Sequence, residues 1–400
     1  MRRASPSLAF VLALACGVWT QAACGPPAGP PGSGSSSRAD LSKGILLYVG
    51  TYTGGASRGI YRLTFDPSSG ALSPPVLAGE TENPSFLALH PGGRVVYAVN
   101  EVDDFQGDES GAVSAFAIDP ATHDLRLLNQ QPSRGAGPCH LSVDREGRNV
   151  LVANYGGGNV AVLPLDSDGQ LRPATAVRRH TGSGPQADRQ DKPYAHAILL
   201  DGAQRLAFSA DLGADRIFID RFGAGAGTLQ PGDPDAVGLE PGSGPRHLAW
   251  HPSGRLLFAV NELRSTVTVL VYDATTGALR PVQTVPMLPP DFTGENTAAE
   301  IAVSADGRFL YASNRGHDSI AILAIDAATS ALTNVGFEPT RGRTPRHFAI
   351  DPSGRWLLAA NQESDTIVVF EIDRASGRLN PVGAPVTVAK PVCILFAPGT

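Results

Sequence analysis

A short apolar segment that ends in a small or polar residue recurs along the chain. Its seven copies occupy residues 46–50, 95–100, 150–154, 206–211, 256–261, 309–314 and 356–361. Successive segment ends lie 50, 54, 57, 50, 53 and 47 residues apart, which is the length of a four-stranded propeller blade. The segments show no helical periodicity, so a solenoid of helices is excluded.

Each copy sits inside a repeat of constant order. In the fifth repeat, four apolar stretches are separated by turns, with the stretches at 247–250, 256–261, 267–272 and 279–282. The first turn is Pro-Ser-Gly at 252–254, and proline and glycine supply the backbone angles that tight hairpins need. The repeats predict an all-β fold, a seven-bladed β-propeller with four antiparallel strands per blade.

The two ends of the repeat array complement each other. The first repeat lacks its opening strand, whereas the chain finishes with segment 390–396, which has the apolar pattern of that strand. We therefore predict that the C-terminal strand closes the ring and leaves no sheet edge open.

Equivalent positions of the repeats encircle the axis of a propeller, so aligning the repeats identifies side chains that converge. Fourteen residues before each segment end (fifteen in the fourth repeat), the chain carries Phe86, His140, His196, His247, Glu300 and His347, with Cys393 at this position in the closing strand. The residue after each segment end forms a second ring of Thr51, Glu101, Tyr155, Leu212, Glu262, Arg315 and Gln362.

These rings have a structural and a functional interpretation. A repeated histidine can be a scaffold residue that bonds to the backbone of the neighbouring blade. The fourth to sixth repeats, however, hold a concentration of charge in His196, Arg246, His247, Glu262, Glu300 and Arg315. This asymmetry favours a functional site. Arg246 and Arg346 share a Pro-Arg-His motif, so either could instead form a salt bridge between blades.

The N-terminus has the pattern of an export signal. Arg2 and Arg3 precede an apolar run at 8–18, which is too short to span a bilayer. We expect a signal peptide at 1–23, a Gly/Pro/Ser-rich tether at 24–43 and the propeller at 44–400. Cys24 is placed either for lipidation, which would tether the protein to a membrane, or beside a simple cleavage site. The protein is then a periplasmic or outer-membrane lipoprotein, or is secreted.

The composition and the absence of certain motifs exclude several classes of binding partner. The 400 residues carry a formal net charge of −6, without the basic surplus that a nucleic-acid-binding protein needs, so we expect no nucleic acid partner. Outside the leader, Cys139 and Cys393 are predicted to be two buried thiols, and a disulfide between them is the alternative that would suit an exported chain. The chain lacks metal-binding and nucleotide-binding motifs, so we expect no metal and no cofactor. We also expect a monomer.

Several motifs together resemble a known family, the seven-bladed propeller lactonases, which include propeller-type 6-phosphogluconolactonase and carboxy-cis,cis-muconate cyclase. The resemblance covers about residues 45–398. It rests on Tyr48-Val49-Gly50-Thr51-Tyr52, Asn83-Pro84-Ser85, Gly137-Pro138 with His140, Arg189-Gln190 with His196, Asp211-Leu212-Gly213 with Asp215, Gly244-Pro245-Arg246-His247, Val260-Asn261-Glu262, Ser313-Asn314-Arg315-Gly316 and Pro345-Arg346-His347.

The resemblance implies a set of site residues. The cyclase branch works through a histidine, two arginines and a glutamate, which correspond to the catalytic candidates His196, Arg246, Arg315 and Glu262. The chain departs from the family at Tyr194, where a first histidine is usual. The candidates for substrate binding or a supporting shell are His140, His247, Glu300, Arg346 and Asn314.

Lactone hydrolysis needs an acid/base group, cations and an oxyanion donor. We assign the acid/base role to His196 or Glu262. Arg246 and Arg315 are assigned to an anionic group and to the developing oxyanion, with Arg346 expected to matter less. The leading hypothesis is a lactonase acting on a small anionic lactone or sugar acid, like 6-phosphogluconolactonase. Two alternatives stay open: a carboxymuconate-type cycloisomerase, and a non-catalytic propeller that binds a ligand or protein in the cell envelope.

Overall fold

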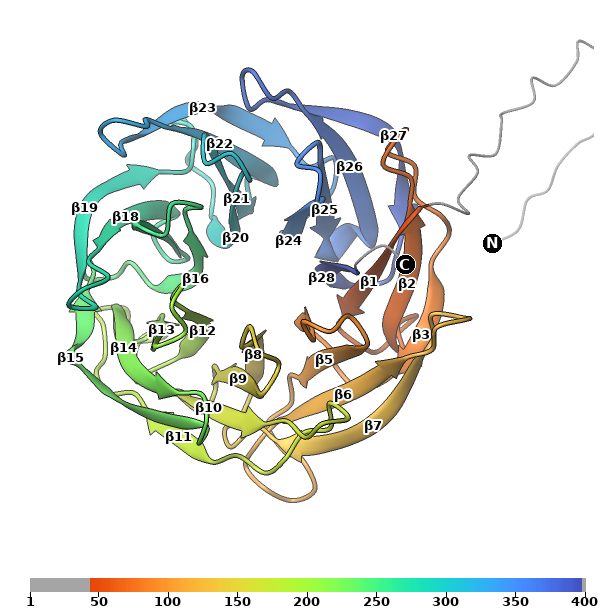
Figure 1. Ribbon diagram of the computed structural model, residues 1–400. Helices are drawn as coiled ribbons and strands as arrows, with labels where there is room; N and C mark the ends of the chain where they lie inside the picture. Colours follow the sequence, from red (N-terminus) through yellow and green to blue (C-terminus); the bar gives the residue numbers. More distant parts are fainter. Residues whose placement is uncertain (1–43, 398–400) are drawn as a thin grey trace, which may run out of the picture. The chain divides into compact units, whose positions relative to one another are not determined.

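The computed structural model describes residues 44–397, which form a ring of seven four-stranded antiparallel sheets (Figure 1). This confirms the predicted seven-bladed β-propeller. The expected signal peptide, the tether and Cys24 lie outside the described residues. Within the described range, no helix is long and apolar enough to cross a membrane.

The first four blades follow one another around the ring. Blade 1 contains β1 (Ile45–Thr51), β2 (Gly59–Phe65), β3 (Val76–Glu80) and β28 (Pro391–Phe396). Blade 2 contains β4 (Leu87–Leu89), β5 (Val95–Asn100), β6 (Ala112–Ile118) and β7 (Leu125–Pro132). Blade 3 contains β8 (Pro138–Val143), β9 (Asn149–Asn154), β10 (Asn159–Pro164) and β11 (Ala176–Arg179). Blade 4 contains β12 (Ala195–Leu200), β13 (Leu206–Asp211), β14 (Arg216–Gly223) and β15 (Thr228–Gly238).

Three further blades complete the ring. Blade 5 contains β16 (Pro245–Trp250), β17 (Leu256–Asn261), β18 (Thr266–Tyr272) and β19 (Leu279–Pro286). Blade 6 contains β20 (Thr297–Val303), β21 (Phe309–Arg315), β22 (Ser319–Ile325) and β23 (Leu332–Pro339). Blade 7 contains β24 (Pro345–Ile350), β25 (Trp356–Asn361), β26 (Thr366–Ile372) and β27 (Leu379–Thr387), with a single 3₁₀ turn at Gln362–Ser364.

The C-terminal strand closes the ring as predicted. β28 pairs with β1 in antiparallel register, with Val49 opposite Ile394 and Leu47 opposite Phe396. Blade 1 is therefore built from both ends of the propeller (Figure 1). If β28 were removed, blade 1 would lose one of its four strands and the edge of β1 would be exposed.

The apolar segments of the repeat form the second strand of each blade, and these strands are largely buried. Every residue of β5, β9, β17 and β25 is buried. Their side chains pack against the neighbouring sheets on both faces. One cluster, for example, joins Phe258 and Val260 of blade 5 to Leu310 and Ala312 of blade 6. Burial on both faces explains why the segments are continuously apolar instead of alternating.

Candidate active site

A cavity of about 210 Å³ lies where the second strands of the blades end around the axis. All seven blades or the loops that lead into them contribute to its wall. The lining residues are Tyr52, Glu101, Cys139, Tyr155, Arg189, His196, Glu262, Arg315 and Arg346. Four of these, Glu101, Tyr155, Glu262 and Arg315, belong to the second ring that the alignment of repeats identified.

Bulges in the innermost strands decide which axial side chains reach the cavity. In β8, β12, β16 and β24 the register slips between the first and third residues. The bulged residues are Cys139, His196, Arg246 and Arg346. A bulge re-aims a side chain and is common beside active sites.

The register corrects one part of the alignment. His140, His247 and His347 pair with the residue before the end of the second strand, and in blade 4 this place belongs to Ala197. His196 therefore does not share a ring with the other histidines. It shares one with Cys139, Arg246 and Arg346, and this explains why it faces the cavity while the three other histidines do not.

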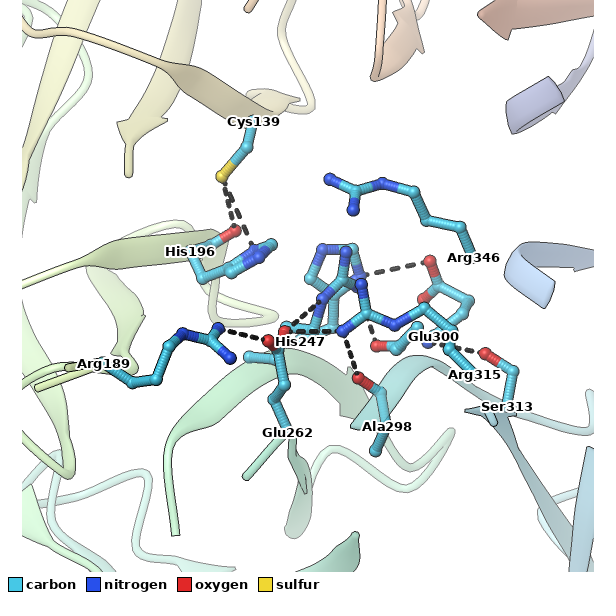
Figure 2. A network of polar contacts seen from close by, with 12 residues as sticks. Cys139, Arg189, His196, His247, Glu262, Ala298, Glu300, Ser313, Arg315 and Arg346 are labelled. Carbon is cyan, nitrogen blue, oxygen red and sulfur yellow. Dashed lines mark hydrogen bonds and ion pairs between the residues drawn. The ribbon is translucent and has the colours of Figure 1, made fainter. Parts of the chain in front are cut away.

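Glu262 is the centre of the charged network (Figure 2). Its Oε1 lies 2.7 Å from Arg189 Nη2, and its Oε2 lies 2.9 Å from Arg315 Nη2. Arg246 Nε approaches Oε2 to 3.1 Å. Burial raises the pKa of Glu262, but the three guanidinium groups outweigh it and bring the pKa to about 2. Glu262 is consequently a fixed anion that holds arginines in place, and it is a poor proton acceptor.

Main-chain carbonyl groups of β20 hold two of these arginines. Arg246 Nη1 donates to the Ala299 oxygen at 2.8 Å, and Arg315 Nη2 donates to the Ala298 oxygen at 3.0 Å. Both carbonyls lie where β20 slips its register against β21. Arg246 is 2% exposed and lies behind the cavity wall. Its burial, together with neighbouring Arg315, lowers its pKa to about 10.

His196 is a neutral imidazole on the cavity wall. Its Nδ1 lies 3.5 Å from Cys139 Sγ, and the same sulfur lies 3.4 Å from the main-chain oxygen of His196 (Figure 2). Burial and the positive charge of Arg246 lower the pKa of His196 well below its ordinary value. Burial also raises the pKa of Cys139, so this residue is a thiol. Among the described residues, His196 Nε2 has no hydrogen-bond partner.

Arg189 comes from the loop at 180–194 between β11 and β12, which is longer than the corresponding loops between the other blades. Gln190 anchors this loop, because its buried side chain donates from Nε2 to the Leu212 oxygen and to Asp215 Oδ1, each at 2.8 Å. A Cβ atom at Gly213 would collide with the main chain of this loop, so glycine is required for the close approach. The loop is rigidly fixed, and Arg189 is held against Glu262.

A second polar cluster lies on the axis, away from the cavity lining. Glu300 Oε2 lies 3.1 Å from His247 Nδ1 and 3.3 Å from His347 Nε2. Burial lowers the pKa of His247 well below its ordinary value, and it brings that of His347 to about 4 even though Glu300 opposes the shift. The candidates His247 and Glu300 therefore support the inner end of the site and do not line the cavity.

The structural interpretation of the repeated histidine holds for two members. His140 Nδ1 accepts from the Ile198 amide at 3.4 Å, and His347 Nδ1 accepts from the Ile394 amide at 3.2 Å. In each pair the amide belongs to the following blade. These histidines join neighbouring blades at the axis.

Of the two remaining candidates, Asn314 has a structural role and Arg346 lines the cavity. Asn314 is completely buried, donates to the Met287 oxygen at 2.8 Å and accepts from Asn296 at 3.0 Å, so it holds loops together rather than facing the cavity. Arg346 does line the cavity, and so does Glu101 from blade 2. The alignment suggested that the charged residues of the site are confined to blades 4 to 6. The structure adds charged residues from blades 2 and 7.

His196, Glu262 and Arg315 line one cavity, with Arg246 directly behind, so residues from three consecutive blades converge as the sequence predicted. Sequence analysis did not select Tyr52, Glu101, Tyr155, Arg189 or Cys139 for the site. Within residues 44–397, no group of three or more His, Cys, Asp or Glu side chains is arranged to hold a metal ion.

The fold agrees with the comparisons with known proteins. The chain belongs to the lactonase family of seven-bladed β-propellers, whose model matches residues 46–396. It is similar to the 6-phosphogluconolactonase of Bacillus subtilis, with 38% identity over 301 residues, which cover 75% of this chain and 83% of the relative. The 6-phosphogluconolactonase of Formosa agariphila is 34% identical over 317 residues, or 76% and 85% of the two chains.

A solved structure shows the same relationship. The periplasmic gluconolactonase PpgL of Pseudomonas aeruginosa superposes with a TM-score of 0.84 at 35% identity, over 89% of this chain and 99% of that one. The protein is therefore a member of the propeller lactonase family that is similar to 6-phosphogluconolactonases. The comparisons do not favour the cycloisomerase or the non-catalytic alternative.

Proposed function

We propose that this protein hydrolyses the intramolecular ester of a sugar lactone and releases the open sugar acid. The observation that carries the proposal is that neutral His196 and Arg315, which Glu262 fixes, line the same cavity. A neutral imidazole can accept a proton, and a fixed cation stabilises an oxygen that becomes negative.

The reaction needs only a water molecule and these side chains. His196 Nε2 takes a proton from the water while the water oxygen bonds to the lactone carbonyl carbon. The carbonyl oxygen becomes an anion that Arg315 stabilises. The bond between this carbon and the ring oxygen then breaks, and the ring oxygen takes the proton back from His196. The sum is lactone plus water to hydroxy acid.

Glu262 has a different role from the acid/base role considered on sequence alone. With a pKa of about 2, Glu262 stays ionised during turnover and is too weak a base to accept a proton from water. Its charge instead lets several guanidinium groups lie together in a buried site. The acid/base role therefore falls to His196.

The test is hydrolysis of glucono-δ-lactone and of its 6-phosphorylated form by the propeller, corrected for spontaneous hydrolysis. Arg315→Ala should lower kcat about 10²- to 10³-fold, the effect of losing one preorganised oxyanion donor. His196→Gln should do the same. Arg343→Ala removes an exposed arginine outside the cavity and is the matched control. Exhaustive chelation should leave the rate unchanged.

Three results would contradict the proposal. These are a wild-type rate equal to the spontaneous rate, full activity in Arg315→Ala, and activity that chelation abolishes and a divalent cation restores. Incubation with a carboxymuconate tests the cycloisomerase alternative in the same preparation.

We also propose that the protein works outside the cytoplasm. The charged and apolar leader at 1–23 and the similarity to a periplasmic gluconolactonase support this. Mass spectrometry of the mature chain from a bacterial host tests it. Cleavage before Cys24 with a lipid adduct indicates a membrane-tethered form, cleavage without an adduct indicates a free form, and an intact leader contradicts export.

A further inference from the structure

The four arginines of the site differ in how many of their donors are already used. Arg189 and Arg315 bond to Glu262, and Arg315 also donates to a main-chain oxygen. Arg246 is buried between Glu262 and the Ala299 oxygen. Arg346 makes no hydrogen bond to any described residue. Its donors face the cavity.

The surroundings of Arg346 keep it free and in one orientation. Its guanidinium lies over the Tyr52 ring, 5.2 Å from the centroid. The nearest carboxylate is Glu101, whose Oε2 is 3.9 Å from Arg346 Nη2, beyond hydrogen-bond distance. Glu101 is held back because the Tyr52 hydroxyl shares its one proton between the two Glu101 oxygens, each 2.9 Å away. Tyr52 thus supports the cation with its ring and occupies the competing anion with its hydroxyl.

The cavity holds more positive than negative charge. Glu262 offsets only part of the charge of Arg189, Arg246 and Arg315. Arg346 stands apart from that cluster and has no hydrogen-bonded partner among the described residues (Figure 2). A planar guanidinium with free donors binds a carboxylate or a phosphate through two parallel hydrogen bonds.

We propose that Arg346, positioned by Tyr52, binds a second anionic group of the substrate, a phosphoryl or a carboxylate group remote from the reacting ester. This residue then determines the preference for anionic over uncharged sugar lactones. The inference rests on the proposed function and specifies it. It also revises the expectation that Arg346 matters less than Arg246 and Arg315, because its loss should act on substrate binding instead of turnover.

Calorimetric titration with reaction products tests this subsite without turnover. Gluconate carries one carboxylate, glucarate adds a second at the far end, and 6-phosphogluconate adds a phosphoryl group there. We expect wild type to bind at least one of the two longer anions more tightly than gluconate by about 10- to 100-fold, the effect of a charge-assisted hydrogen bond. Tighter binding of glucarate would indicate that Arg346 binds a carboxylate group of the substrate, and tighter binding of 6-phosphogluconate would indicate a phosphoryl group.

Two variants locate the preference. Arg346→Ala should abolish it, and Arg346→Lys should restore part of it because a cation returns without the planar fork. Arg341→Ala is the control, since this exposed arginine pairs with Glu338 at 3.4 Å in the loop before β24. Circular dichroism melting establishes that each variant is folded. Equal binding of all three acids by wild type, or an unchanged preference in Arg346→Ala, would overturn the inference.

A second pair of variants tests the role of Tyr52. Tyr52→Phe keeps the ring but releases Glu101, which should then pair with Arg346 and weaken dianion binding. Adding Glu101→Gln to Tyr52→Phe should restore the binding, because the competing charge is gone. A merely structural tyrosine would show no such rescue.

Lactone turnover is measured separately, so the two proposals can fail separately. Arg346-dependent dianion binding without lactone hydrolysis would reject the proposed function and leave the subsite standing. Hydrolysis with no effect of Arg346 on KM for the phosphorylated lactone would reject the subsite alone.

Discussion

Acid should destabilise this propeller from about pH 6.5 downward, because four histidines are buried without charge around its axis. His140, His196, His247 and His347 are each at most 8% exposed. Burial is the largest cause that lowers the pKa of each of them below the ordinary value. In the unfolded chain each recovers a pKa of about 6.5 and takes up a proton that the folded protein excludes.

The size of the effect follows from His347. Its pKa is about 4 in the folded protein, so one such group lowers the free energy of unfolding by about 2 kcal/mol between pH 7.5 and pH 5. The other three act in the same direction. Four excluded protons give a limiting slope of about 5 kcal/mol per pH unit, which is comparable to the whole stability of an ordinary domain.

Urea unfolding of the propeller between pH 5 and pH 8 measures this slope. Stability should be constant above pH 7 and fall increasingly steeply below pH 6.5. His347→Gln should reduce the slope by about one proton. Cys393→Ala is the control, since it removes a buried axial side chain that does not titrate in this range and should lower stability equally at every pH. A flat profile down to pH 5, or the same slope in His347→Gln, would refute the reasoning.

Three further predictions concern closure, the charge network and the acid/base group. Removing residues 389–400 should abolish cooperative thermal unfolding, because it deletes β28 from blade 1; a soluble truncation with an intact transition would argue against closure by this strand. Glu262→Gln should lower stability by about 3–5 kcal/mol and abolish lactone turnover, because it leaves buried Arg246 without its counter-charge, and wild-type stability in denaturant titrations would contradict this. In stopped-flow assays kcat/KM should hold through pH 6.5 and fall only well below it, because burial and Arg246 lower the pKa of His196 well below its ordinary value; a midpoint at or above the ordinary histidine pKa of about 6.5 would exclude His196 as the base.

Much of the architecture was determined by the sequence alone. Seven apolar segments at intervals near 50 residues require seven similar blades, and the missing first strand requires the C-terminal segment to replace it. The second ring also identified Glu101, Glu262 and Arg315 as neighbours, because a regular repeat places the residue after each segment end at the same height around the axis. The repeat spacing therefore predicts the number of blades and the equivalent positions around the axis without any information on side-chain contacts.

The tertiary structure decided which of the aligned residues share the cavity. One extra residue in each of several inner strands separates His196 and Arg346 from His140 and His347, and a bulge leaves no mark on the apolar pattern from which the repeats were aligned. The loop that brings Arg189 to Glu262 is longer than the corresponding loops of the other blades, so the alignment of the repeats does not place Arg189. Arg346 is distinguished from Arg246 only by its surroundings: both follow a proline and precede a histidine, but Glu262 and a carbonyl occupy Arg246 while Tyr52 keeps Glu101 away from Arg346. Whether an arginine is free to bind substrate depends on the residues around it in space. Those residues come from different blades and meet only when the propeller is folded.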